Sequence, residues 1–170
     1  MAILMELSRV FIREMADVQI IELSEVDGER TFPIVIGLPE AFAIERRLKN
    51  LESPRPQTHD LLASLIGHLG GTLREIVIHD LSSGVFFAKL VIDQNGRTVE
   101  VDSRPSDAIA LGVAESVPIY VAEHVLEQAL ADSPLDEGDL TGEGPEDDDG
   151  GDDDGDDQED GPPGGGTFDS

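Results

Sequence analysis

Apolar and polar residues alternate along the first part of the chain, a pattern typical of strands that bury one face. The alternation predicts three successive strands, over Glu6–Ile12, Asp17–Val26 and Thr31–Ile36. Asp27-Gly28, between the second and third, is a hairpin signal. From Pro39 to Lys49 the apolar residues instead recur every three or four positions, which predicts a helix.

The second half of the chain repeats this order. It predicts strands over Leu73–His79, Val85–Ile92 and Thr98–Asp102, and then a helix over Pro105–Ala114. An ungapped offset of 67 residues aligns the two halves, with seven identities over the 35 positions from 10 to 44. The apolar positions of the strands and the start of the helix also coincide between the two halves, which favours a duplicated β-β-β-α unit. The alternative is that any two units of this kind align equally well.

Three further elements complete the prediction. An amphipathic helix begins near Thr58, after a proline-rich link, and ends before Gly70-Gly71. Its apolar positions follow helical spacing: Leu61, Leu62, Leu65, Ile66 and Leu69. A short strand over Pro118–Val121 and a helix over Glu123–Leu130 follow the second unit. The expected fold is therefore α+β, one compact domain of two β-β-β-α units with a mostly antiparallel sheet, an extra helix between the units, and a short strand and helix at the end.

Acidic residues set the last part of the chain apart. Residues 136–170 hold 16 of the 37 Asp and Glu residues, 10 of the 18 glycines and no Lys or Arg. A segment with so few apolar side chains cannot offset the entropy cost of ordering. The sequence therefore predicts a folded domain over residues 1–135 and a disordered acidic tail over residues 136–170.

Charge also bears on the source and on partners. The formal net charge is −26, and Lys is scarce, occurring only at Lys49 and Lys89. Excess Asp with few Lys favours a protein from a halophile, where concentrated salt screens self-repulsion; the alternative is an ordinary acidic protein with a charged tail. The net −10 of residues 1–135 disfavours tight phosphate binding in dilute buffer, but in molar salt net charge is a poor guide to nucleic-acid binding.

Several classes of protein are excluded by what the sequence lacks. The absence of Cys excludes disulfides, thiolate metal sites and a Cys nucleophile. No apolar run approaches the length of a membrane span, and the N-terminus lacks the basic region of a signal peptide. A soluble, cytoplasmic protein that does not bind membranes is the expectation. Phosphate-loop, dinucleotide-binding, zinc-protease and serine-hydrolase motifs are also missing.

Two stretches combine Arg-Pro with an Asp at a helix start: 55–62 (RPQTHDLL) and 102–111 (DSRPSDAIAL). Unpaired backbone N–H groups at a helix start attract anions, and the Arg guanidinium can donate two hydrogen bonds to one phosphate. A His is suited to acid–base work near neutral pH, and Asp to holding a divalent cation or a water. The alternative for both stretches is structural: proline starts the helix, Asp complements its dipole, and Arg–Asp pairs make rigid corners.

At these stretches the sequence resembles the bifunctional nuclease domain family. The likeness extends to residues 79–90 (HDLSSGVFFAKL), 118–121 (PIYV), and 34–37 (IVIG) followed by Glu40-Ala41. It covers roughly residues 8–130 in the right order. The resemblance implies a compact α+β domain that self-associates, with a dimer favoured, and an activity that cleaves both DNA and RNA.

The candidate site residues lie at positions that match the family's motifs. We expect Arg55 and Arg104 to bind the substrate phosphate, and His59, Asp60 and Asp107 to be catalytic. Asp60, Asp107 and Glu40 are the candidate ligands of a Mg²⁺ or Mn²⁺ ion; Glu40 is the repeat-equivalent acid of Asp107. The hypothesis is a nuclease with little sequence preference. The alternative is a non-catalytic dimeric module that binds a small anion or a protein, favoured because residues 112–115 lack the basic residue that relatives tend to carry after the helix.

Overall fold

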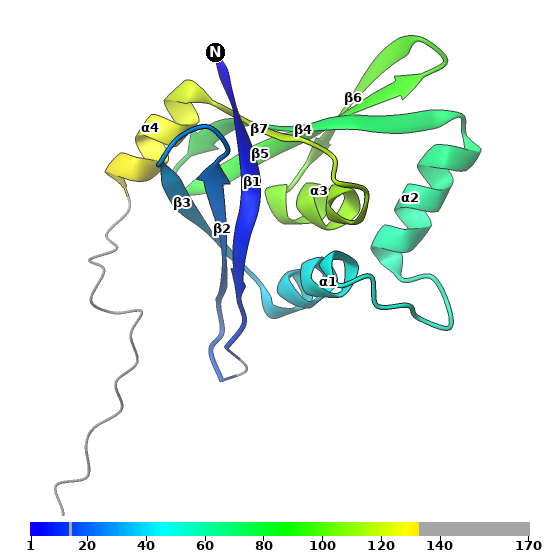
Figure 1. Ribbon diagram of the computed structural model, residues 1–170, viewed down its shortest axis with the longest axis horizontal. Coiled ribbons are helices and arrows are strands. Elements are labelled where there is room, and N and C mark those ends of the chain that lie inside the picture. The colour runs from blue at the N-terminus through cyan, green and yellow to red at the C-terminus, as the bar shows by residue number, and fades with distance from the viewer. Residues whose placement is uncertain (14, 133–170) are drawn as a thin grey trace, which may run out of the picture. The chain divides into compact units, whose positions relative to one another are not determined.

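A computed structural model describes residues 1–13 and 15–132, and the predicted tail over residues 136–170 lies outside these residues. Figure 1 shows their elements along the chain. The strands are β1 (Ala2–Phe11), β2 (Gln19–Glu25), β3 (Thr31–Ile36), β4 (Gly71–Ser82), β5 (Val85–Gln94), β6 (Arg97–Ser103) and β7 (Ile119–Ala122). The helices are α1 (Leu38–Leu48), α2 (Thr58–His68), α3 (Pro105–Gly112), a short 3₁₀ turn η1 (Val113–Glu115) and α4 (Glu123–Ala131). The predicted α+β class and the order of its elements are confirmed.

The seven strands form one mixed sheet in the order β3-β2-β1-β7-β4-β5-β6. Every neighbouring pair is antiparallel except β4 and β7, which are parallel. The two β-β-β-α units therefore occupy opposite ends of the sheet, and β7 joins them at its centre. An offset of 67 residues carries the first residue of α1, Leu38, onto the first residue of α3, Pro105, as the duplication predicts.

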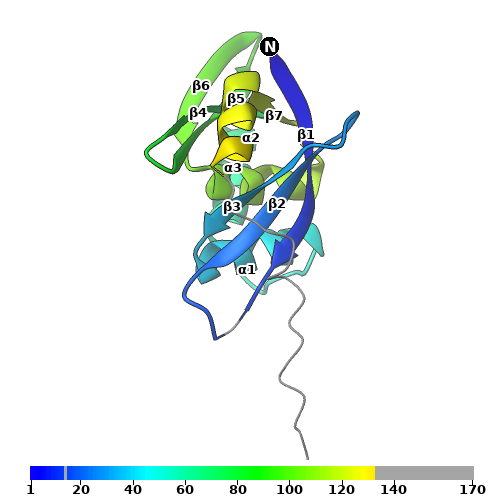
Figure 2. The ribbon, with the colours of Figure 1, turned by 90° about the vertical axis from the view of Figure 1, so that its left-hand side faces the viewer.

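One face of the sheet supplies the core. Alternate residues of several strands, such as Ile21 and Leu23 in β2 or Ile76 and Ile78 in β4, are fully buried. They pack against the apolar sides of α1, α3 and α4, which makes one continuous hydrophobic cluster. Figure 2, seen from the α4 side, shows the two halves of the sheet diverging around α4 and α3. Within the described residues, no helix has the length and apolar character needed to cross a membrane.

Two features differ from expectation. The first strand begins at Ala2 rather than Glu6, because its first residues pair with β7, from Ala2 with Ala122 to Met5 with Ile119. That partner is far away in sequence, and the alternation of the segment does not reveal it. Helix α2 begins at Thr58 as expected, with Gln57 as its N-cap, but although it is amphipathic none of its residues is fully buried.

Candidate functional site

Helix α3 is buried along its length except at Asp107. Pro105 starts the helix and Arg104 is its N-cap residue, with extended backbone. Every residue of α3 is buried except Asp107, whose side chain is about one-third exposed. Because tight packing surrounds the helix, the direction of the Asp107 carboxylate is fixed by the fold.

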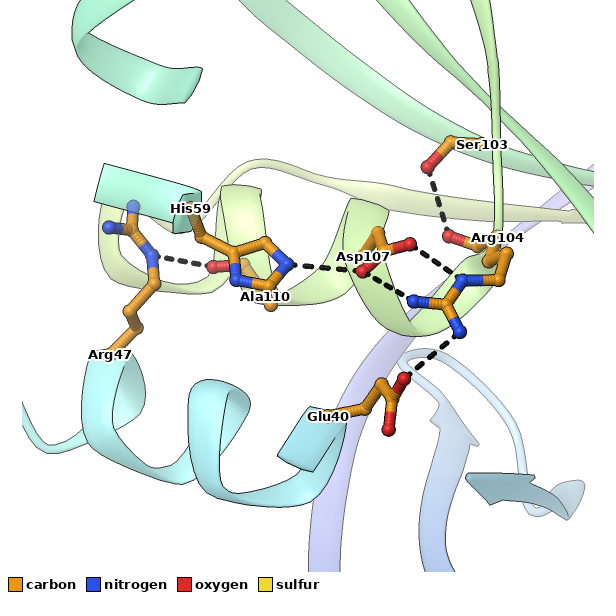
Figure 3. Close-up of polar contacts among 7 residues, drawn as sticks. All are labelled: Glu40, Arg47, His59, Ser103, Arg104, Asp107 and Ala110. Carbon is orange, nitrogen blue, oxygen red and sulfur yellow. Dashed lines mark hydrogen bonds and ion pairs between the residues drawn. The ribbon is translucent and has the colours of Figure 1, made fainter. Parts of the chain in front are cut away.

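Asp107 is the centre of a chain of polar contacts (Figure 3). Arg104 donates two hydrogen bonds to its carboxylate, from Nε at 2.7 Å and from a terminal nitrogen at 3.0 Å. The other terminal nitrogen of Arg104 donates to Glu40, at the start of α1, at 2.9 Å. From the opposite side, His59 Nε2 at the start of α2 lies 3.2 Å from Asp107 Oδ1. The cluster Glu40–Arg104–Asp107–His59 thus joins the starts of three helices.

The charge state of Asp107 fixes the role of each nitrogen of His59. Burial alone would raise the pKa of Asp107, but hydrogen bonds from Arg104 and His59 outweigh it and hold the pKa below its usual value. An ionised carboxylate only accepts hydrogen bonds, so His59 donates from Nε2. The neutral imidazole then keeps Nδ1 as a proton acceptor, which is the arrangement of an Asp-oriented general base.

A cleft of about 440 Å³ adjoins this cluster. Glu40 and Arg104 line it, together with Asp17 and the exposed apolar side chains of Val18, Val35 and Val85, whereas His59 and Asp107 do not line it. The side chain of Arg104 is 64% exposed, so its guanidinium faces both the cleft and the solvent. A cleft with mostly apolar walls and a few charged groups at one end is the usual form of a ligand site.

Asp60 lies in a different cluster from its neighbour His59. It accepts hydrogen bonds from Arg46 at 2.7 Å and Arg47 at 2.5 Å, both near the end of α1. It also accepts the backbone N–H of Gln57 at 3.0 Å, which caps α2. Asp60 therefore has a structural role and ties α2 to α1, but its partners are Arg46 and Arg47 and not the neighbouring Arg55 that the sequence offered.

Arg47 is a structural residue that sequence reasoning missed. Its side chain is only 8% exposed, and it donates to the carbonyl oxygen of Ala110 at 2.6 Å (Figure 3). It also donates to the carbonyl oxygen of Leu111 at 3.0 Å. These contacts satisfy backbone groups near the end of α3 that lack partners in the helix. The signal was in the sequence, because Arg47 follows Ala41 and Ile44 at helical spacing and so lies on the buried side of α1.

We expect the Asp60 ion pairs to make the protein sensitive to acid. Arg46 is the main cause that lowers the pKa of Asp60 to about 2, against 3.8 for the unperturbed group. Because the folded pKa is the lower one, the stabilisation is complete above about pH 4 and is lost as the pH falls from about 4 to about 2. Its size is about 1–2 kcal/mol. Unfolding in urea at pH 5 and pH 3 should show that Asp60→Asn removes this part of the pH dependence.

Asp93→Asn is the matched control for that measurement. Asp93 pairs with the exposed Arg74 on the sheet, and the pKa of Asp93 is lowered by that arginine. Exposed pairs contribute little to stability, so the acid sensitivity of this variant should follow that of the parent. Equal pH dependence in Asp60→Asn and Asp93→Asn would contradict the role given to Asp60.

Arg55 lies apart from both clusters. Its side chain is exposed, and within residues 1–13 and 15–132 it makes no hydrogen bond or salt bridge. The six candidate residues thus fall into three places. Glu40, His59, Arg104 and Asp107 form one cluster, Asp60 pairs with Arg46 and Arg47, and Arg55 lies by itself.

The three candidate metal ligands do not fit a divalent cation as they are arranged. Carboxylate oxygens suit Mg²⁺ or Mn²⁺, but Glu40 and Asp107 both direct an oxygen to Arg104, whose guanidinium takes the cation's position between them. Asp60 is engaged by Arg46 and Arg47. In the described part of the chain, no three His, Cys, Asp or Glu residues are grouped as metal ligands.

Comparison with known proteins shows what the sequence is similar to. The sequence model of the bifunctional nuclease domain family matches residues 21–134. Two proteins of Mycobacterium tuberculosis, both named as uncharacterized, are 48% identical over 107 residues, which cover 63% of this chain and 63% of each relative. A rice protein from Oryza sativa subsp. indica, named bifunctional nuclease 1, is 25% identical over 118 residues, 67% of this chain and 36% of its own length.

The matches cover only part of each relative. It spans somewhat under two thirds of the mycobacterial relatives and about a third of the rice protein. The relatives come from a mycobacterium and from rice, so they give no support to the halophilic source predicted from the acid excess.

Proposed function

Because the chain belongs to the bifunctional nuclease domain family, we propose that it hydrolyses phosphodiester bonds of DNA or RNA with little sequence preference. The observation that carries the proposal is the contact of Asp107 with both His59 and Arg104, of which Arg104 also lines an open cleft. A general base oriented by a carboxylate, next to a guanidinium, is suited to phosphoryl transfer. The apolar cleft walls at Val18, Val35 and Val85 offer no side-chain donors or acceptors that would distinguish one base from another.

In the proposed step, His59 Nδ1 takes a proton from the attacking oxygen, which is a water or, in RNA, the neighbouring 2′-hydroxyl. That oxygen bonds to phosphorus while the bond to the leaving oxygen breaks, and the leaving oxygen is protonated by solvent. Asp107 holds the imidazole in the required tautomer and stabilises the imidazolium that forms. The exposed edge of Arg104 lies where it can meet charge on the phosphate oxygens.

The first experiment is a cleavage assay on the full chain. Labelled single-stranded DNA, single-stranded RNA and duplex DNA are incubated at low and at molar salt, and products are separated by length. We expect cleavage of at least one substrate without a preferred position. Asp107→Asn should reduce the rate by about 100-fold or more, because the imidazole loses its orienting charge. Asp93→Asn alters a half-buried Asp that pairs with Arg74 on the sheet, outside the Asp107 cluster, and should retain the rate of the parent.

Metal dependence is tested in the same assay. Each reaction is run with Mg²⁺, with Mn²⁺ and with EDTA. Because the guanidinium of Arg104 already lies between the carboxylates of Glu40 and Asp107, where a cation would bind, we expect cleavage to persist in EDTA. Activity that appears only with an added cation would show that Arg104 gives way to a metal. The absence of products from folded protein in every condition would overturn the nuclease proposal.

One observation favours a second candidate, the non-catalytic dimeric module. All three guanidinium nitrogens of Arg104 are directed at Glu40 and Asp107, so the cluster as it stands has one more negative than positive charge. A phosphate entering the cleft must displace part of this pairing. A folded protein that self-associates but cleaves nothing would support this second candidate.

A further inference from the structure

Helix α2 turns its apolar side to the solvent. The residues that face the domain are the smaller or polar ones, His59, Ala63 and Ile66, at spacings of four and three. Four leucines lie on the outside and are between 41% and 62% exposed: Leu61, Leu62, Leu65 and Leu69. In Figure 1, α2 stands at one end of the domain, away from β1–β3. We call these four residues the α2 leucine face.

An apolar stripe of this kind is unfavourable on an isolated monomer. Single exposed leucines are ordinary, but four on neighbouring turns of one helix mark a surface that is covered by a partner. The helix is held to the domain mainly by contacts at its start, from His59 to Asp107 and from Asp60 to Arg46 and Arg47. Covering the leucine face therefore adds apolar burial to an element that has little of its own.

The charge of this face distinguishes among the partners that can cover it. Residues 57–70 contain one acidic residue, Asp60, in a chain with 37 acidic and 11 basic residues. That one carboxylate is neutralised by Arg46 and Arg47. An acidic copy of the same chain is repelled by surfaces rich in Asp and Glu, whereas this helix adds no uncompensated negative charge of its own.

Other occupants fit less well. Residues 136–170 of the same chain contain 16 acidic residues and few apolar ones, so they offer little to bury against leucines. A nucleic acid presents phosphates, for which this face has no Lys or Arg. We propose that the α2 leucine face is the contact between two copies of this chain, related by a two-fold axis that brings Leu65 of each copy near Leu65 of the other.

The size of the contact sets its strength. A helix of 11 residues is about 16 Å long, so two such helices bury less surface than a permanent dimer does. We expect a reversible dimer with a Kd on the order of 10 µM. Added salt should strengthen it, because salt screens the repulsion between the acidic domains and favours apolar burial.

Sedimentation velocity of the full chain tests the proposal, over about 1–300 µM to bracket that Kd. We expect a shift from monomer to dimer with rising concentration, and more dimer with added NaCl. Leu65→Glu places two like charges at the axis and should raise the Kd by about tenfold or more. Val26→Glu adds the same charge at another exposed apolar residue and should leave the Kd unchanged. Circular dichroism verifies that both variants are folded.

Cross-linking tests the same geometry without an added charge. The sequence has no cysteine, so Leu65→Cys introduces a single thiol that pairs only with its copy. Mild oxidation should give a covalent dimer with Leu65→Cys and little with Val26→Cys. A chain that stays monomeric at every concentration and salt, or a dimer that Val26→Glu breaks and Leu65→Glu does not, would overturn the proposal. Neither result depends on whether the protein cleaves nucleic acid.

Discussion

His59→Ala is expected to reduce the rate of phosphodiester cleavage by about 10²–10⁴-fold, the usual contribution of a general base. His59 Nε2 is held by Asp107, which leaves Nδ1 as the proton acceptor at the start of α2. Alanine removes the acceptor, and Asp107 keeps its two hydrogen bonds from Arg104. The measurement is the initial rate on the substrate that the parent protein cleaves best, at saturating substrate.

The matched control is His68→Ala on the same helix. His68 is exposed and lies within hydrogen-bond distance of Ser64 one turn earlier, so it makes no contact with the cluster at Asp107. Its replacement should change the rate by less than about twofold. If the two alanine variants lose the same activity, the loss follows from a weakened α2 and His59 is not the base. If His59→Ala keeps the parent's rate, His59 has no part in the step.

Arg47→Met is expected to lower the free energy of unfolding by about 2–4 kcal/mol, because it leaves two backbone carbonyls of α3 without their donor and takes one of two arginines from the partly exposed Asp60. The methionine retains the apolar stem, so the cavity is small. What is lost is the donor to three groups: the Asp60 carboxylate and the carbonyl oxygens of Ala110 and Leu111. Buried acceptors without partners are costly. The free energy is measured by urea unfolding near neutral pH.

Arg74→Met provides the comparison. Arg74 also donates to an Asp, but its side chain is 62% exposed and lies on the sheet surface. Exposed pairs contribute about 0–1 kcal/mol, so this variant should differ little from the parent. A similar, small effect from both substitutions would show that Arg47 is not the link that joins α1, α2 and α3.

The order of elements was predictable because it depends on local patterns. Strand alternation, the Asn95-Gly96 hairpin and the proline at the start of α3 each require only a few neighbouring residues, and the structure has them where the sequence indicates. The pairing of β7 between β1 and β4 was not predictable, because nothing within Ile119–Ala122 indicates which strand edges it joins.

The separation of His59 from Asp60 shows how far the candidate site could be predicted from the sequence. Both follow the same Arg-Pro at one helix start, and sequence proximity suggested a joint role. Consecutive helical residues point about 100° apart, so one side chain meets Asp107 on α3 and the other meets α1. Which direction each takes depends on how three helices pack, and that is decided by the core. The pairing of Arg104 with Asp107 was easier to predict from the sequence, because the two residues lie within one helix turn of each other.

The central place of β7 affects how the chain folds. During synthesis, β1 and β4 have left the ribosome long before Ile119–Ala122, the residues that pair with both of them. Until then, β1 and β4 each leave an open hydrogen-bonding edge, and such edges attract other strands. Joining Ala2 to Ala122 closes a loop of nearly the whole domain, and contacts so distant in sequence form slowly. The two halves therefore become one sheet in a late step, and the period before that step is when the nascent protein is most exposed to aggregation.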